Sequence, residues 1–352
     1  MLPAFMLLLM LGQTAPAQTP AVAEDDFVIR NFTFTSGETL PELRIHYRTL
    51  GTPRKDAQGV AQNAVLIMHG TGGTGGQFTG RNFAGELFGP GQPLDATKYF
   101  IILPDDIGHG GSSKPSDGLR ATFPRYGYVD MVTAEHRLVT EGLGVNRLRL
   151  VMGTSMGGMH TWMWGGMYPG FMDALMPLAS LPTQIAGRNR AWRRVVIDAI
   201  RNDPEWKNGD YTTQPQSLRT AAQMLWLAGS NPVRRQREAP TVVDADRVLD
   251  AYVANYLKTG DANNILYALE ASRDYDPGPA LDKITAPLVA INSADDIINP
   301  PELQILEREI RRVRNGRAIV LPLSDRTAGH GTHTLAAVWK EHLVALLAET
   351  ER

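Results

Sequence analysis

One serine, Ser155, lies in the run Gly-Thr-Ser-Met-Gly, which fits the G-x-S-x-G pattern of a nucleophilic serine. A serine hydroxyl is a poor nucleophile by itself, so this chemistry also needs a base and a group that orients the base. Two later loops supply such groups. Asp295 and Asp296 follow the apolar run APLVAIN, and His330 and His333 follow the last apolar run, AIVLPL. The order serine, aspartate, histidine along the chain predicts chemistry through a covalent acyl-serine.

The sequence favours Asp296 and His330 as the partners of Ser155. Asp296 precedes Ile-Ile-Asn-Pro, where this loop usually turns back toward the pocket, and Asp295 is the alternative. His330 lies in the loop Ala-Gly-His-Gly, whereas His333 begins the closing helix, a position more typical of a cap or a pocket wall. Without a nearby motif such as H-E-x-x-H, the two histidines predict no metal site.

Two backbone N–H groups are expected to hold the oxyanion that forms during acyl transfer. One belongs to Met156, the residue after the serine, and the other to Thr71, in the glycine-rich run from His69 to Gly76. This run has two other interpretations, a flexible loop or a phosphate cradle, but it lacks the Lys-Ser/Thr ending of a P-loop.

The residues around Ser155 predict the sharp turn that such a serine needs. Residues 148–152 form an apolar run of strand length, and residues 159–168 carry aromatic and methionine side chains at helical spacing. The three glycines between these runs would let the strand and the helix approach closely and let the serine adopt a strained backbone conformation. An ordinary glycine-rich loop between a strand and a helix is the alternative.

Apolar runs alternate with helical patterns along most of the chain, which predicts an α/β protein with a mostly parallel central sheet flanked by helices. The first part of this core is expected over residues 26–180 and the second part over residues 281–350. Between them, residues 181–280 lose the strand-like runs and contain helical segments rich in Trp, Met, Arg and Gln. This change predicts a helical lid insertion over the carboxyl edge of the sheet.

Composition and charge exclude several classes of partner. The 352 residues carry a net charge of −2 and no cysteine, so neither a nucleic-acid surface nor a disulfide is expected. Residues 1–17 contain an apolar core followed by Ala-Pro-Ala, the pattern of a cleaved signal peptide, which predicts a periplasmic or secreted protein. The apolar run is too short to span a bilayer, so no membrane contact is expected of the mature form; if the segment is not a signal peptide, the protein is cytoplasmic.

From about residue 32 to its end, the chain resembles the homoserine O-acetyltransferase family of α/β-hydrolase fold proteins. The resemblance rests on segments such as FTSGETLPELRIHYRTLGT, NAVLIMHG, FPRYGYVDM, GTSMGGM, DPEWKNGDY and SADDIINPPE. It implies an α/β-hydrolase fold with Ser155, Asp296 and His330 as a catalytic triad and with Thr71 and Met156 as the oxyanion donors. It also implies a helical lid that forms a homodimer interface.

Three departures from the family pattern favour hydrolysis. The run from His69 to Gly73 replaces the family's H-A-L-T-G, and the segment DIGHGGSSKPS is hydrolase-like. The lid segment AQMLWLAGSNP lacks the arginine that would pair with a substrate carboxylate. We therefore predict a serine hydrolase of the esterase or amidase type that acts on a small-molecule ester or amide without a cofactor.

The alternative function is O-acyl transfer to an alcohol acceptor, with homoserine as one candidate, because only the second nucleophile differs between the two reactions. Arg193, Arg194 and Arg219 are the candidates for an acceptor-binding residue in the predicted lid. A third interpretation, a binding protein that keeps the fold without catalysis, is disfavoured by the complete triad.

Overall fold

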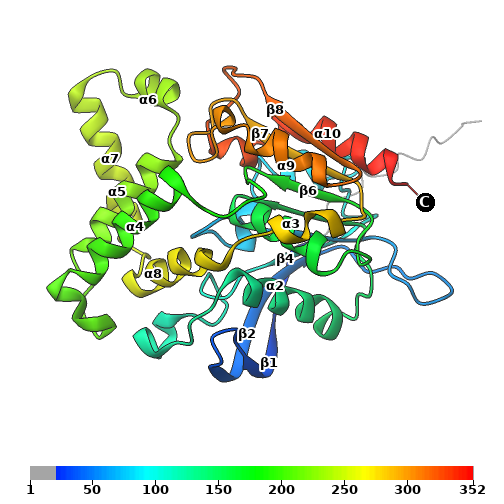
Figure 1. Cartoon of the computed structure of the whole chain (residues 1–352), viewed down its shortest axis with the longest axis horizontal. Helices are drawn as coiled ribbons and strands as arrows, with labels where there is room; N and C mark the ends of the chain where they lie inside the picture. The colour runs from blue at the N-terminus through cyan, green and yellow to red at the C-terminus, as the bar shows by residue number, and fades with distance from the viewer. Residues whose placement is uncertain (1–20, 352) are drawn as a thin grey trace, which may run out of the picture.

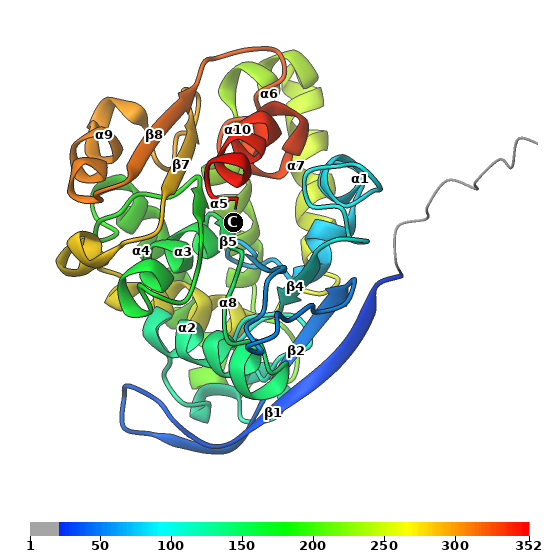
Figure 2. The ribbon, with the colours of Figure 1, turned by 90° about the vertical axis from the view of Figure 1, so that its right-hand side faces the viewer.

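The computed structural model describes residues 21–351 as an eight-stranded sheet with helices on both faces (Figures 1 and 2). The order across the sheet is β1-β2-β4-β3-β5-β6-β7-β8. The β1–β2 and β2–β4 pairs are antiparallel and the remaining neighbours are parallel, so the sheet is mostly parallel, as the sequence predicts. The strands are β1 (Ala23–Thr33), β2 (Thr39–Leu50), β3 (Ala64–Met68), β4 (Phe100–Pro104), β5 (Leu150–Thr154), β6 (Leu175–Leu178), β7 (Leu288–Ser293) and β8 (Gly316–Leu321).

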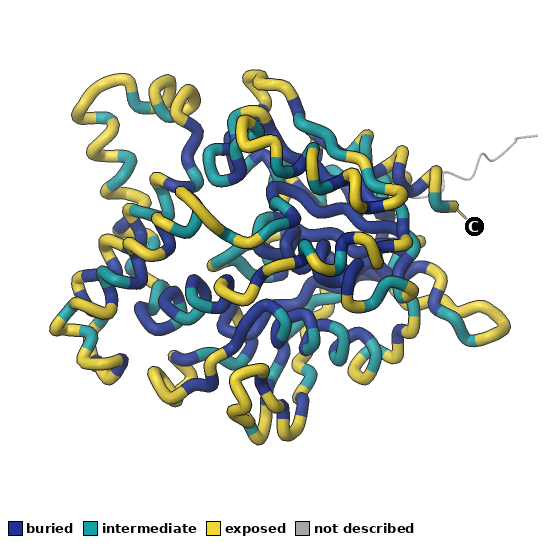
Figure 3. The backbone as a smooth tube through the Cα atoms, in the orientation of Figure 1, coloured by how far each residue is buried: buried dark blue, intermediate teal, exposed yellow. Residues whose placement is uncertain are grey.

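Helices cover both faces of the parallel part of the sheet, and for this reason its central strands are buried along their whole length and consist mainly of apolar residues. One face packs against α2, α3 and α9, and the other packs against α1 and α10. In Figure 3 these strands form the buried centre of the molecule. The covering helices are α1 (Ala84–Leu87), α2 (Tyr128–Arg137), α3 (Met156–Met167), α9 (Ile305–Glu309) and α10 (Ala336–Glu349).

Between β6 and β7 the chain forms a separate group of helices, at the left of Figure 1. They are α4 (Gly187–Arg201), α5 (Ser217–Gly229), α6 (Pro232–Glu238), α7 (Val242–Tyr256) and α8 (Ala262–Glu270). The apolar faces of α4, α5 and α8 share a small core of their own, built around residues such as Ile197, Leu218 and Leu269. Residues 181–280, where the sequence predicts helical segments and no strands, thus contain α4 to α8.

The expected signal peptide, residues 1–17, lies outside the described residues. Within residues 21–351, none of the helices has the length and apolar character needed to cross a membrane.

Candidate active site

Ser155 forms the turn between β5 and α3 by itself. The strand ends at Thr154 and the helix begins at Met156. The backbone of Ser155 has φ 55° and ψ −110°, a conformation that costs a non-glycine residue free energy and that clusters at functional sites. The serine therefore stands at the carboxyl end of a central strand, as the sequence predicts.

The neighbouring glycines let backbone segments touch. A Cβ on Gly157 would overlap the carbonyl of Met68, and a Cβ on Gly153 would overlap the carbonyl of Gly157. The Gly157 N–H also donates to the carbonyl of His69 over 2.8 Å. The first turn of α3 is thereby held against the end of β3, which fixes the direction in which Ser155 is presented.

His330 bridges Ser155 and Asp296. Its Nε2 lies 2.8 Å from Oγ of Ser155, and its Nδ1 lies 2.9 Å from Oδ2 of Asp296. With the ring proton on Nδ1 and donated to the carboxylate, Nε2 carries the lone pair that can accept the serine proton. The loops after β5, β7 and β8 thus bring together the three residues that the sequence favours.

Asp296 is buried, and its carboxylate is well supplied with hydrogen-bond donors. Its carboxylate accepts hydrogen bonds from the N–H groups of Ile298 (2.8 Å) and Asn299 (3.1 Å) in addition to His330. Burial alone would raise the pKa of Asp296, but the charge and hydrogen bond of His330, together with the two N–H groups, lower it below its ordinary value. The carboxyl therefore stays ionised and holds the imidazole in one tautomer.

Asp295, the alternative aspartate, has a different set of partners. Its Oδ2 accepts a hydrogen bond from the Gly329 N–H over 2.9 Å and another from the side-chain amide of Asn231. Gly329 immediately precedes His330, so Asp295 anchors the loop that carries the histidine. The geometry separates the two aspartates into one that contacts the imidazole and one that holds its loop.

His333 lies beside His330, with the ring centroids 5.2 Å apart and the rings nearly perpendicular. It sits in a short 3-10 turn, Gly331–Thr334, and not at the start of the closing helix as expected, because α10 begins only at Ala336. Burial lowers the pKa of His333 to about 3, so its ring is neutral. Its position is that of a pocket wall.

The two expected oxyanion donors lie near the serine in different elements: Met156 follows it at the start of α3, and Thr71 lines the same cavity. Met156 is the first residue of α3, so its N–H has no acceptor within the helix. Thr71 lies inside a tight turn closed by the Gly73 N–H donating to the carbonyl of Gly70 over 2.9 Å. The Gly70 backbone packs directly on Ser155, since a Cβ there would lie 3.3 Å from the serine Cβ.

A cavity of about 370 Å³ opens beside Ser155 and His330. The loop from Gly70 to Gly73 forms one wall, and helices α4, α5 and α7 form the opposite wall. This volume is in the range of small-molecule sites. The residues contributed by these helices are Trp192, Arg193, Leu225, Ala228, Gly229, Tyr252 and Tyr256.

Arg193 is the charged residue that the helices present to this cavity. It is only 2% exposed, its Nε–H donates to the side chain of Asn189 over 3.1 Å, and its guanidinium lies 4.8 Å from the centroid of the Trp192 ring. Its Nη1 has no hydrogen-bond partner, and no carboxylate of residues 21–351 pairs with it. Burial lowers the pKa of Arg193, the neighbouring Tyr128 hydroxyl opposes that shift, and the nearby Arg190 adds to it.

A buried guanidinium without a counter-ion is costly, and an anionic ligand group would offset that cost. The other two arginines that the sequence singled out do not have this environment. Arg194 is exposed and pairs with Asp198, and Arg219 is exposed.

Tyr252 and Tyr256 line the cavity but were not predicted to do so from the sequence. The available signal was their spacing of four along α7, which places both side chains on one face of the helix.

Comparison with known proteins identifies the same architecture. The alpha/beta hydrolase fold family model matches residues 63–333. A probable acyltransferase of Methanothermobacter thermautotrophicus is 31% identical over 281 residues, which cover 80% of this chain and 85% of the relative. A homoserine O-acetyltransferase of Chlorobaculum parvum is 31% identical over 327 residues, which cover 85% of this chain and 87% of the relative.

Solved structures agree on the fold at lower sequence identity. Esterase E22 superposes with a TM-score of 0.81 and 19% identity, covering 93% of this chain and 100% of that protein. A homoserine O-acetyltransferase from Bacillus anthracis superposes with a TM-score of 0.79 and 22% identity, covering 93% of this chain and 97% of that protein. An esterase and a transferase thus share the fold to nearly the same degree, so the fold does not distinguish the two reactions.

Proposed function

We propose that this chain, which belongs to the alpha/beta hydrolase fold family and to its homoserine O-acetyltransferase branch, transfers an acyl group from an ester donor to an alcohol acceptor through an acyl-enzyme on Ser155. The observation that carries the proposal is the hydrogen-bonded series of Asp296, His330 and Ser155 beside the cavity. This series supplies a nucleophile, a base and a group that orients the base.

In the first half-reaction, Oγ of Ser155 attacks the acyl carbon while Nε2 of His330 takes the hydroxyl proton. Asp296 stabilises the imidazolium that forms, and the N–H groups of Thr71 and Met156 donate to the developing oxyanion. When the tetrahedral intermediate collapses, His330 returns the proton to the departing alkoxide. The acyl group then remains on Ser155 as an ester.

In the second half-reaction, Nε2 of His330 removes the proton from the acceptor hydroxyl as that oxygen attacks the acyl-serine. The bond from the acyl carbon to Oγ breaks, and His330 gives the proton back to Ser155. The product is a new ester of the acceptor. Water in place of the acceptor would give the free acid, which is the hydrolysis that the sequence favours.

Two findings support transfer over hydrolysis. The relatives that are 31% identical over at least 80% of this chain are named as acyltransferases. In addition, Arg193 brings to the cavity a guanidinium with an unpartnered Nη1. A carboxylate-bearing alcohol such as homoserine would thereby find the partner that the segment AQMLWLAGSNP lacks.

A partition assay tests this function. The purified protein is given p-nitrophenyl acetate with and without homoserine, and nitrophenol, acetate and acetylhomoserine are measured separately, with Ser155→Ala as the control. We expect homoserine to increase turnover and to appear as its acetyl ester. If acetate accounts for all of the nitrophenol at every acceptor concentration, the protein is a hydrolase and the transferase proposal is wrong.

A further inference from the structure

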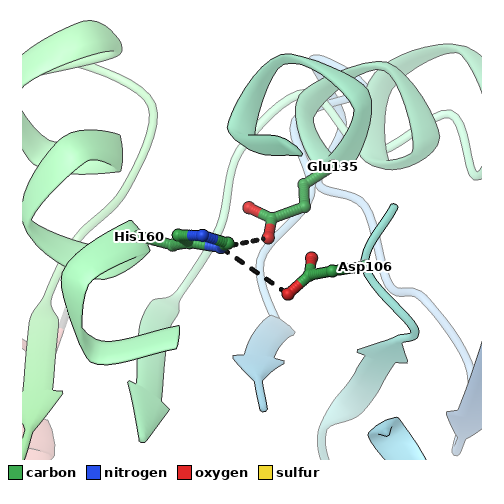
Figure 4. A group of neighbouring side chains, drawn as sticks. All are labelled: Asp106, Glu135 and His160. Atoms are coloured by element: carbon green, nitrogen blue, oxygen red, sulfur yellow. Dashed lines mark hydrogen bonds and ion pairs between the residues drawn. The ribbon is translucent and has the colours of Figure 1, made fainter. Parts of the chain in front are cut away.

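A second group of ionisable side chains lies behind the active site and takes no part in the acyl chemistry. Asp106 follows β4, Glu135 lies on α2 and His160 lies on α3, and the three side chains converge on one point (Figure 4). All three residues are at most 2% exposed. Since they come from three separate elements, only the folded chain brings them together.

The contacts within this group leave ligand atoms free. Nδ1 of His160 lies 2.8 Å from Oε1 of Glu135 and 3.7 Å from Oδ2 of Asp106. Neither carboxylate oxygen of Asp106 accepts a hydrogen bond from an N–H or hydroxyl group, although its side chain is fully buried and directed at His160 (Figure 4). Its neighbour is the Glu135 carboxyl, with which it can share a hydrogen bond only when one of the two carries a proton. The other oxygen of Glu135 accepts a hydrogen bond from the indole of Trp164 over 2.6 Å, which holds that carboxylate in place.

The charge of the group is uncompensated by side chains. No lysine or arginine of the described chain forms an ion pair with Asp106 or Glu135, whose partners are histidines. Two carboxyls buried together in this way must either carry protons or have positive charge between them. A divalent cation would supply two positive charges for two carboxylates and one neutral imidazole.

We propose that Asp106, Glu135 and His160 bind one divalent transition-metal ion. One ligand atom from each residue lies within 4.8 Å of the other two. Around a zinc ion with bonds of about 2.0–2.2 Å to imidazole nitrogen and carboxylate oxygen, tetrahedral ligand atoms stand roughly 3.3 Å apart. The 2.8 and 3.7 Å separations measured from His160 Nδ1 bracket that spacing, so small side-chain movements would complete the site.

The protonation of the group is compatible with metal binding. Burial, followed by the charge of Glu135, raises the pKa of Asp106 well above its ordinary value, and burial raises the pKa of Glu135 to about 7. Without a cation these carboxyls hold protons that a metal ion displaces. His160 can offer Nδ1 as a ligand when its proton moves to Nε2, although that buried nitrogen lacks the acceptor that a metal-bound histidine usually has.

The ion would join the elements that carry the oxyanion donors. His69, at the end of β3, accepts the Asp106 N–H on Nε2 over 3.0 Å and contacts the Gly70 carbonyl through Nδ1 over 2.8 Å. His160 lies on the same helix as Met156, one turn farther along. A metal ion at this point would therefore link the segment after β4 with α2 and α3, and His69 would extend that link to the loop that contains Thr71.

The test uses the full-length Ser155→Ala variant, so that acyl transfer plays no part in the readout. Metal content is measured by plasma mass spectrometry on protein purified without chelators. The metal is then removed, and Zn²⁺ is returned in competition with a chromogenic chelator while Tm is followed. We expect one equivalent of metal per chain and a rise in Tm when Zn²⁺ is added.

The variants Asp106→Asn and Glu135→Gln keep the side-chain shapes and should weaken Zn²⁺ binding by more than about tenfold. Glu141→Gln is the matched control, because Glu141 follows the same helix but pairs with Arg137 at the surface. The proposal is overturned if the parent chain contains no stoichiometric metal and Zn²⁺ leaves its Tm unchanged. It is equally overturned if Zn²⁺ binds but the affinity does not depend on Asp106 and Glu135.

Discussion

Nε2 of His330 lies 2.8 Å from Oγ of Ser155, although 175 residues separate them along the chain. Two strands, β6 and β7, stand between the strands that precede these residues, so the loop over residues 322–329 must reach back across the sheet edge. Asp295 holds the end of that loop through the Gly329 N–H, and Asp296 holds the imidazole itself. Adjacent aspartates therefore perform two separate tasks.

Because Asp296 contacts the imidazole and Asp295 holds its loop, substitution of Asp296 should mainly lower kcat and substitution of Asp295 should mainly lower stability. Asp296→Asn should lower kcat by about 10⁴-fold with little change in KM, because the amide cannot stabilise the imidazolium or enforce the tautomer. Asp295→Asn should act mainly on stability and lower kcat much less. Steady-state kinetics on both variants checks this, and a larger kcat loss for Asp295→Asn would reverse the assignment.

The strained backbone of Ser155 predicts that two inactive variants differ in their free energy of unfolding. Glycine accepts φ 55° and ψ −110° without the steric cost that alanine incurs. Ser155→Gly should therefore be about 1 kcal/mol more stable than Ser155→Ala, while both lose acyl-transfer activity. Urea unfolding of the two proteins measures the difference, and equal stabilities would show that the turn stores no strain.

Arg193 predicts selectivity for acceptors with a carboxylate. Arg193→Met should raise the KM for homoserine by about tenfold to a hundredfold, which corresponds to the loss of a charged hydrogen bond. An amino alcohol of the same length without the carboxylate should be affected much less. Arg194→Met is the control, because Arg194 lies on the same helix but is exposed and pairs with Asp198. Equal effects on both acceptors would remove Arg193 from the acceptor site.

Because α3 and β3 are in close contact at Gly157, a single methyl group at this position should destabilise the fold. Gly157→Ala would push a Cβ into the carbonyl of Met68, which should destabilise the fold by about 1–3 kcal/mol and displace the Met156 N–H. Gly170→Ala is the matched control, since nothing lies within 4 Å of a Cβ there. Thermal unfolding and kcat of the two variants should separate clearly, and two equally stable, active proteins would contradict the packing described.

Buried His333 predicts a loss of stability in mild acid. Its folded pKa is lowered to about 3, so between about pH 6.5 and 3 the unfolded chain binds the proton and the folded chain does not. Stability is therefore lost as pH falls below about 6.5. His333→Gln should flatten the dependence of the unfolding free energy on pH by about 1 kcal/mol per pH unit near pH 5. Urea unfolding at several pH values tests this, and an unchanged slope would show that His333 is protonated in the folded chain.

Motifs with strong local constraints were predictable from the sequence. The turn at Ser155, the strands before Asp296 and His330, and the helical segment after β6 follow from glycine positions and hydrophobic periodicity. The positions of the two aspartates relative to the imidazole depend on how one loop closes, so the sequence left Asp295 open as an alternative.

The features that depend on burial were not predictable in this way. Arg193 and Arg194 are neighbours in one basic run, and only packing of α4 determines that the first is buried beside the cavity and the second is exposed. Asp106, Glu135 and His160 are separated by 29 and 25 residues, without any shared motif, so nothing in the sequence predicts that they converge. One of the three departures behind the expectation of hydrolysis was a missing arginine in the segment AQMLWLAGSNP, whereas the structure brings Arg193 to the cavity from a different helix.

Trapping of the acyl-enzyme tests directly whether Ser155 carries the acyl group and passes it to the acceptor. The protein is mixed with p-nitrophenyl acetate, quenched in acid and digested, and the acetylated peptide is located by mass spectrometry; a parallel sample is chased with homoserine before quenching. We expect one acetyl group on Ser155 that disappears in the chase as acetylhomoserine forms. An acetyl group on another residue, or a Ser155 adduct that decays only to acetate at the same rate with and without homoserine, would contradict it.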